Sequence, residues 1–228
     1  MMQDHNAPPL NPLPAVVWLL VLPMLAMEIV VAAGETGLVG GPMAIGWRAE
    51  AVQMLAFSPD MMRAMLAAHQ YPLDGMWRLI SYPFVHASVS HALFCIVILM
   101  AMGKFVGEVF RWWAVLGIFV VATLVGAAVF TALPMVKQPL AGAWVPIYGL
   151  IGAFTWILWD RLRGAGRQRL RAFSMIGMLL AFQVIFGVLF GTGWDWVAEL
   201  PAFASGFALS FLVAPGGPAK LRTLLRQR

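Results

Sequence analysis

The sequence predicts an all-α polytopic membrane protein: a bundle of six transmembrane helices with a long first external loop. Composition, the length of the apolar stretches and the placing of basic residues support this. Hydrophobic residues fill 61% of the 228 positions and charged residues only 11%, which excludes an ordinary water-soluble domain. The single cysteine excludes an intrachain disulfide. The net charge of +5 lies in loops and the tail, which favours anionic lipid over nucleic acid as a partner.

Six stretches approach the roughly 20 apolar residues that a helix needs to cross the hydrocarbon core. We expect the first to remain as a membrane helix rather than a cleaved signal peptide, because no Lys or Arg precedes its long apolar run. The fourth and sixth contain proline and glycine, which favours tight packing inside the bundle. The stretches cover residues 14–33, 86–104, 113–133, 142–159, 172–192 and 197–214.

The distribution of Lys and Arg predicts the orientation. With six spans both termini share one side of the membrane, and the loops form two alternating sets. Eleven of the 15 basic residues fall in the set that includes the tail, five of them in the 160–171 loop. The positive-inside rule then places both termini in the cytoplasm. This predicts a cytoplasmic segment 1–13, a membrane domain 14–214 and a basic cytoplasmic tail 215–228.

The first loop, residues 34–85, is too long for a plain connection. It mixes apolar and charged positions at near-helical spacing, so an amphipathic helix is expected within it. Immersion of this helix in the lipid interface and packing of the helix on the bundle both fit the pattern.

Three segments resemble the rhomboid intramembrane serine proteases. The first resembles the family's loop into its second helix, the second its Gly-x-Ser-Gly fourth helix, and the third its Ala-His-x-x-Gly sixth helix. The resemblance covers residues 77–212 and implies a rhomboid-like six-helix bundle, in a family of serine-type endopeptidases. The residues that carry it are Trp77-Arg78 with His86, His91 and Cys95; Gly142 to Gly152 with Tyr148-Gly149-Leu150; and Ala202 to Phe207 with Gly206.

The resemblance fails at the catalytic dyad. Trp144 stands at the position of the nucleophilic serine, Val145 at the neighbouring glycine and Phe203 at the histidine. No histidine follows His91, and no serine lies between residues 90 and 174, so a shifted register does not restore the pair. An indole and a phenyl ring supply neither nucleophile nor base, and the sequence predicts a pseudoprotease without catalytic residues.

Trp144 and Phe203 replace small or polar groups with large rings near the outer face. By analogy with the facing serine and histidine of the family, the two rings could stack and hold the fourth and sixth helices together. The alternative is that they line a groove that recognises the transmembrane helix of a partner.

The histidines match the family's polar groups near the oxyanion site, where Cys95 replaces an asparagine. We expect His86 and His91 to be buried and hydrogen-bonded. A cysteine-histidine dyad of Cys95 and His91, four residues apart, and a metal site of all three side chains are less favoured alternatives. No cofactor and no metal are therefore expected.

Two carboxylates, Glu28 and Glu199, fall inside predicted spans. Both lie within about two turns of the outer interface, where we expect them to reach headgroup water.

A rhomboid scaffold without its nucleophile retains the ability to admit a transmembrane segment. The sequence therefore favours binding of client transmembrane segments, or membrane-protein quality control, in a multi-pass protein of the bacterial inner membrane. An active rhomboid-type endopeptidase with atypical chemistry is the first alternative, and a small-solute transporter is the second.

Overall fold

The computed structural model describes residues 12–162, 164, 166–190 and 193–215. The predicted segment 1–13 and tail 215–228 fall almost entirely outside this part of the chain. Within it the regular structure is helical, and one isolated antiparallel bridge pairs Phe57 with Leu140. The chain is an all-α polytopic membrane protein, as the sequence predicted.

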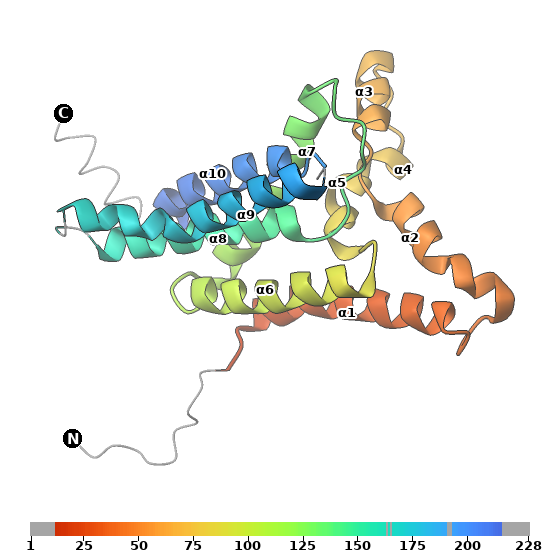
Figure 1. Ribbon diagram of the computed structural model, residues 1–228, viewed down its shortest axis with the longest axis horizontal. Coiled ribbons are helices and arrows are strands. Elements are labelled where there is room, and N and C mark those ends of the chain that lie inside the picture. The colour runs from red at the N-terminus through yellow and green to blue at the C-terminus, as the bar shows by residue number, and fades with distance from the viewer. Residues whose placement is uncertain (1–11, 163, 165, 191–192, 216–228) are drawn as a thin grey trace, which may run out of the picture.

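Six long helices occupy the six predicted stretches and run side by side (Figure 1). Four of them are long and apolar enough to cross a membrane by length and composition alone: α1, α6, α7 and α10. Helices α8 and α9 lie alongside these four in the bundle. The bounds are α1 (Ala15–Glu35), α6 (Val89–Gly107), α7 (Trp112–Ala132), α8 (Trp144–Arg161), α9 (Ser174–Phe190) and α10 (Trp196–Val213).

Helix α1 starts and helix α10 ends at the same end of the bundle (Figure 1). The opposite end, at which α1 ends and α6 begins, is called the loop end here. Ser88 caps α6 there, since its hydroxyl oxygen accepts a hydrogen bond from the backbone N–H of His91 at 3.2 Å. The cap explains why the helix begins at Val89 and not at residue 86, as the apolar pattern suggested.

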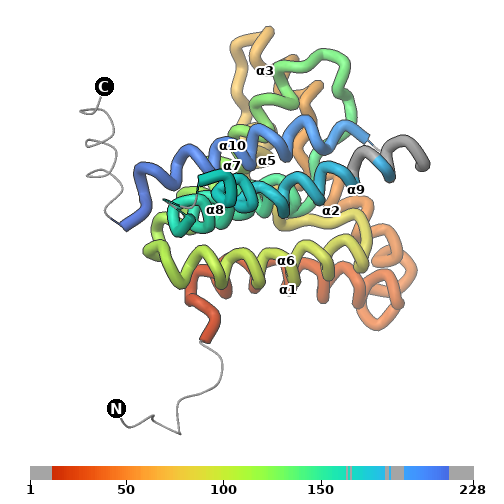
Figure 2. The backbone as a smooth tube through the Cα atoms, turned by 60° about the vertical axis from the view of Figure 1, so that its left-hand side comes forward, coloured from red at the N-terminus to blue at the C-terminus, as the bar shows by residue number. Residues whose placement is uncertain are grey.

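Helix α8 is the central element and packs against α6, α7 and α10, while α6 lies along α1 (Figure 2). Glycines allow α8 and α10 to approach closely. A methyl group at Gly206 would collide with the carbonyl oxygen of Gly149, and one at Gly152 would collide with that of Phe203. The expected tight packing of small residues is confirmed, and dispersion contacts between close backbones stabilise this pair.

The first loop folds into short helices that rest on the bundle. Its helices are α2 (Trp47–Leu55), α3 (Pro59–Ala68), α4 (Leu73–Met76) and α5 (Arg78–Ser81), with 3₁₀ turns at Gly41–Gly46 and Tyr82–Phe84. Helices α3 and α5 contact α7. Packing on the bundle, one of the two interpretations of this loop, is therefore observed.

Arg63 of α3 fixes this contact. Its guanidinium donates to the carbonyl oxygens of Phe130 and Thr131 in the last turn of α7, and to those of Leu133 and Val136 in the segment that follows the helix. A cation at a helix C-terminus also interacts favourably with the helix dipole. The loop therefore closes the end of α7.

Candidate functional site

A cavity of about 920 Å³ opens at the loop end, between α6, α8, α9 and α10. The backbone bridge between Phe57 and Leu140 ties the first loop to the segment that forms its rim. The N–H of Gly142 adds a second tie, donating to the carbonyl oxygen of Tyr82 at 2.8 Å. The lining residues are His91, Phe94, Leu140, Ala141, Gly142, Trp144, Val145, Tyr148, Leu179, Phe182, Gly193, Asp195, Trp196 and Glu199.

The two aromatic replacements are placed differently. Trp144 begins α8, is half-buried and lines the cavity. Phe203 of α10 is half-buried outside the lining, and its ring stacks on Phe207 at 6.5 Å and 19°. The expected stacking of Trp144 on Phe203 is not found among the ring pairs of the described residues. Trp144 forms part of the cavity wall, and the cavity remains open beside its ring.

His86 and His91 lie edge to face, with ring centroids 5.3 Å apart and planes at 88°. Gly142 makes this contact possible. Its φ of +94° suits glycine, and a methyl group there would lie 2.6 Å from Cε1 of His91. Burial, and then the neighbouring His91, lower the pKa of His86 to about 4.

One nitrogen of each histidine lacks the hydrogen bond that the sequence led us to expect. The Nε2 atoms of His86 and His91 are buried and have no hydrogen-bond partner within the described part of the chain. Both rings are oriented by packing against each other and against Gly142. A neutral imidazole tolerates this better than an imidazolium, whose second N–H would also need an acceptor.

Cys95 is fully buried and is not part of the cavity wall. Its sulfur lies near the backbone of Ala143 and Trp144 at the start of α8. It packs in the core with Leu99 and Ile147. In the described residues no group of three or more His, Cys, Asp or Glu side chains could hold a metal ion. The geometry gives Cys95 a packing role, because a buried thiol has no access to a substrate.

Tyr148 is buried in the cavity wall, beside Glu199 of α10. The carboxylate of Glu199 is itself buried, with the residue 4% exposed. The expectation that this carboxylate reaches headgroup water was wrong, because α10 turns it toward α8 and the cavity. One turn earlier, Asp195 accepts a hydrogen bond of 2.9 Å from Nε2 of Gln138.

The model of the rhomboid domain family matches residues 73–216, more than half of the chain. The chain belongs to the rhomboid family. A search among curated proteins gave no match. The family match spans the cavity and includes Trp144 and Phe203, the two residues that the sequence motifs predicted to occupy the dyad positions.

The rhomboid-like Trp77-Arg78 pair belongs to the first loop and not to the cavity wall. The guanidinium of Arg78 donates to three carbonyl oxygens, those of Asp74, Gln53 and Ala56. Trp77 is half exposed. Arg78 therefore joins α2, α4 and α5, and its contribution to the site is to fix the loop that leads into His86.

Sequence reasoning missed Arg48, which precedes the rhomboid match. Its guanidinium donates to both carboxylate oxygens of Glu28, to both of Glu35 and to the carbonyl oxygen of His86. The prediction that Glu28 reaches headgroup water was therefore wrong. Glu28 and Glu35 lie seven residues apart on one face of α1, a pattern that signals a shared basic partner. The hydrogen bonds to Glu28 and then to Glu35, together with the charges of these carboxylates, raise the pKa of Arg48 above its usual value.

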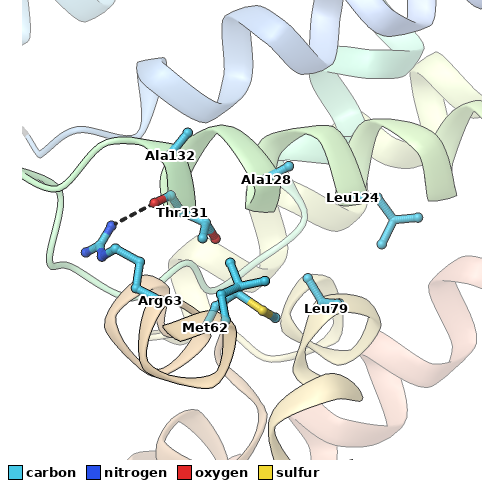
Figure 3. A pocket seen from close by; sticks show the side chains of 8 residues that line it. Met62, Arg63, Leu79, Leu124, Ala128, Thr131 and Ala132 are labelled. Atoms are coloured by element: carbon cyan, nitrogen blue, oxygen red, sulfur yellow. Dashed lines mark hydrogen bonds between the residues drawn. The ribbon is translucent and has the colours of Figure 1, made fainter. Parts of the chain in front are cut away.

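A second cavity of about 550 Å³ lies between the first loop and α7 (Figure 3). Met62 and Leu79 face Leu124 and Ala128 of α7 across it, and Arg63 reaches Thr131 at its edge. The wall is apolar apart from Arg63 and Thr131. Arg63 is already committed to carbonyl oxygens, so this crevice offers little chemistry.

Proposed function

We propose that this rhomboid-family protein is proteolytically inactive and binds transmembrane segments of client membrane proteins in the cavity at the loop end. The single observation that carries the proposal is an open cavity of about 920 Å³ with Trp144 in its wall, the residue that the motif resemblance assigns to the position of the rhomboid serine.

Inactivity follows from the side chains available at the cavity. Serine-type cleavage needs a hydroxyl and a base within hydrogen-bond reach of it. Ser205 and Ser210 of α10 donate instead to carbonyl oxygens in their own helix, at 2.7 Å each. Cys95 is shut in the core. Loss of both members of a dyad removes most of the rate enhancement that the pair provides.

Binding is supported by the position of the cavity between two exposed aromatic residues. Phe94 of α6 is 62% exposed and Phe182 of α9 is 50% exposed, and both line the cavity. Met178 and Ile185 of α9 are also exposed. In a bilayer these side chains face the acyl chains, so a helix arriving laterally meets an apolar entrance before it meets the cavity.

Site-specific photocrosslinking tests this proposal with a defined partner. A benzophenone amino acid replaces Phe94, and in a control protein it replaces Phe105, which lies three turns further along α6 and is 47% exposed. Each protein is reconstituted in liposomes with a labelled transmembrane peptide. We expect saturable crosslinking from position 94 and weak, linear crosslinking from position 105. Equal yields from the two positions would contradict the proposal.

For the cellular setting we propose a bacterial inner membrane with both termini in the cytoplasm. The basic 160–171 loop and the tail support this orientation through the positive-inside rule. Reporter fusions at the end of α10 and within the first loop test it. Activity of a cytoplasmic reporter at the loop position would contradict the orientation.

A further inference from the structure

The client cavity carries an unusual combination of side chains. Two carboxylates line the cavity where α10 begins: Asp195 immediately precedes the helix, and Glu199 follows four residues later in the first turn. This spacing places them on the same side of the helix start. Asp195 stands at the rim, before the first turn, and Glu199 lies one turn deeper. The lining residues that the structure describes include no Lys or Arg, and His91 is the basic side chain among them.

Aromatic rings surround the same space. All four helices around the cavity contribute a Phe, Trp or Tyr ring to its wall. These residues are Phe94, Trp144, Tyr148, Phe182 and Trp196. Trp196 also stacks on Trp194 at 6.5 Å, which fixes its ring at the rim. The negative faces of such rings attract an ammonium or guanidinium group, more strongly when the group is desolvated.

Charge and shape together point to one kind of ligand. We infer that the cavity selects client transmembrane segments that carry a Lys or Arg side chain near the end that enters at the loop end. This inference rests on the proposed function and names the class of client. The long apolar stem of such a residue lies against the aromatic wall while its charged head reaches Glu199 and Asp195.

The selection has a physical use. A Lys or Arg one or more turns inside a membrane helix costs free energy unless it is paired or reaches the interface, so an unpaired one at that depth marks a subunit that lacks its partner. A cavity with two carboxylates gives that charge a temporary counterion. This agrees with a role in membrane-protein quality control.

Two matched peptides and three protein variants test the inference. The peptides are one apolar transmembrane sequence with either Lys or Met at the position that meets the cavity, and binding is followed by energy transfer in liposomes. The variants are Asp195→Asn, Glu199→Gln and, as a matched control, Glu50→Gln in the exposed part of α2. Circular dichroism and thermal unfolding establish that each variant is folded.

We expect the natural protein to bind the Lys peptide about tenfold more tightly than the Met peptide, as desolvated cation–aromatic and ion-pair contacts allow. Glu199→Gln and Asp195→Asn should each reduce that ratio, and Glu50→Gln should leave it unchanged. If Glu199→Gln fails to fold, Asp195→Asn at the exposed rim still decides the question.

The outcomes separate the two proposals. Equal binding of both peptides would overturn the inference and leave client binding intact, whereas no binding of either peptide would overturn client binding itself. A preference for Lys that disappears when phosphatidylethanolamine is added would assign the carboxylates to a lipid ammonium group and overturn the client assignment.

Discussion

Replacing Arg48 with methionine removes the charge that holds the first loop against α1. The guanidinium has five N–H groups, and five hydrogen bonds use them: two to Glu28, two to Glu35 and one to the carbonyl oxygen of His86, at 2.6 to 3.2 Å. Methionine keeps an unbranched stem that packs in the same space. The variant Arg48→Met therefore isolates the electrostatic contribution.

The magnitude follows from the burial of the carboxylates left behind. The Glu28 side chain is 14% exposed and that of Glu35 is 33% exposed, against 10% for Arg48. Removing one partner of a buried ion pair costs about 3–5 kcal/mol, and the greater exposure of Glu35 lowers its share. We expect Arg48→Met to lower the free energy of unfolding by about 3 kcal/mol.

Equilibrium unfolding in mixed micelles measures this change. Adding Glu28→Gln to Arg48→Met should recover about 1–2 kcal/mol, because a neutral amide is cheaper to bury than an unpaired carboxylate. Glu50→Gln, an exposed acidic position in the same loop, serves as the control and should change little. A loss below about 0.5 kcal/mol, or no recovery in the double variant, would refute the reasoning.

Further predictions concern the histidine pair, the helix contact and the thiol. Burial lowers the pKa of His86 to about 4 from 6.5. On acidification His86 is therefore protonated at a higher pH in the unfolded chain than in the folded protein. Stability should then fall by about 2 kcal/mol between pH 7 and pH 5, and His86→Gln should flatten this profile of unfolding free energy. Gly206→Ala should lower the free energy of unfolding by more than about 2 kcal/mol, because the added methyl group collides with α8. Gly117 has open space around it, so Gly117→Ala should leave the free energy of unfolding unchanged or raise it slightly in the same assay. Cys95 should react slowly with maleimide in the folded protein and quickly after denaturation, as mass spectrometry would show.

The six helices could be predicted because each has a strong local signal. Apolar stretches of membrane length mark them, and the glycines of α8 and α10 mark the tightest contact. Boundaries were less certain. The pattern placed the start of the second span at residue 86, and the Ser88 cap moved it to Val89, because capping depends on one hydroxyl and not on hydropathy.

The sequence named three residues that line the cavity, His91, Trp144 and Tyr148, but not the contacts that they make. Trp144 and Phe203 were identified from the motifs, yet the direction of each ring depends on packing, and Phe203 pairs with Phe207 along its own helix. Arg48 was missed because its partners are 13 and 20 residues away in the sequence. The carboxylates of Glu28 and Glu199 were noticed, but their burial depends on neighbours that a hydropathy pattern does not show.

Cleavage of transmembrane substrates by the natural protein and by a restored variant tests the central claim most directly. The variant combines Trp144→Ser, Val145→Gly and Phe203→His, which rebuilds the rhomboid dyad in the retained cavity. We expect the natural protein to cut none of a panel of substrates in liposomes and to resist serine-directed probes, and we expect the restored variant to be labelled and to cut. Cleavage by the natural protein would contradict the account.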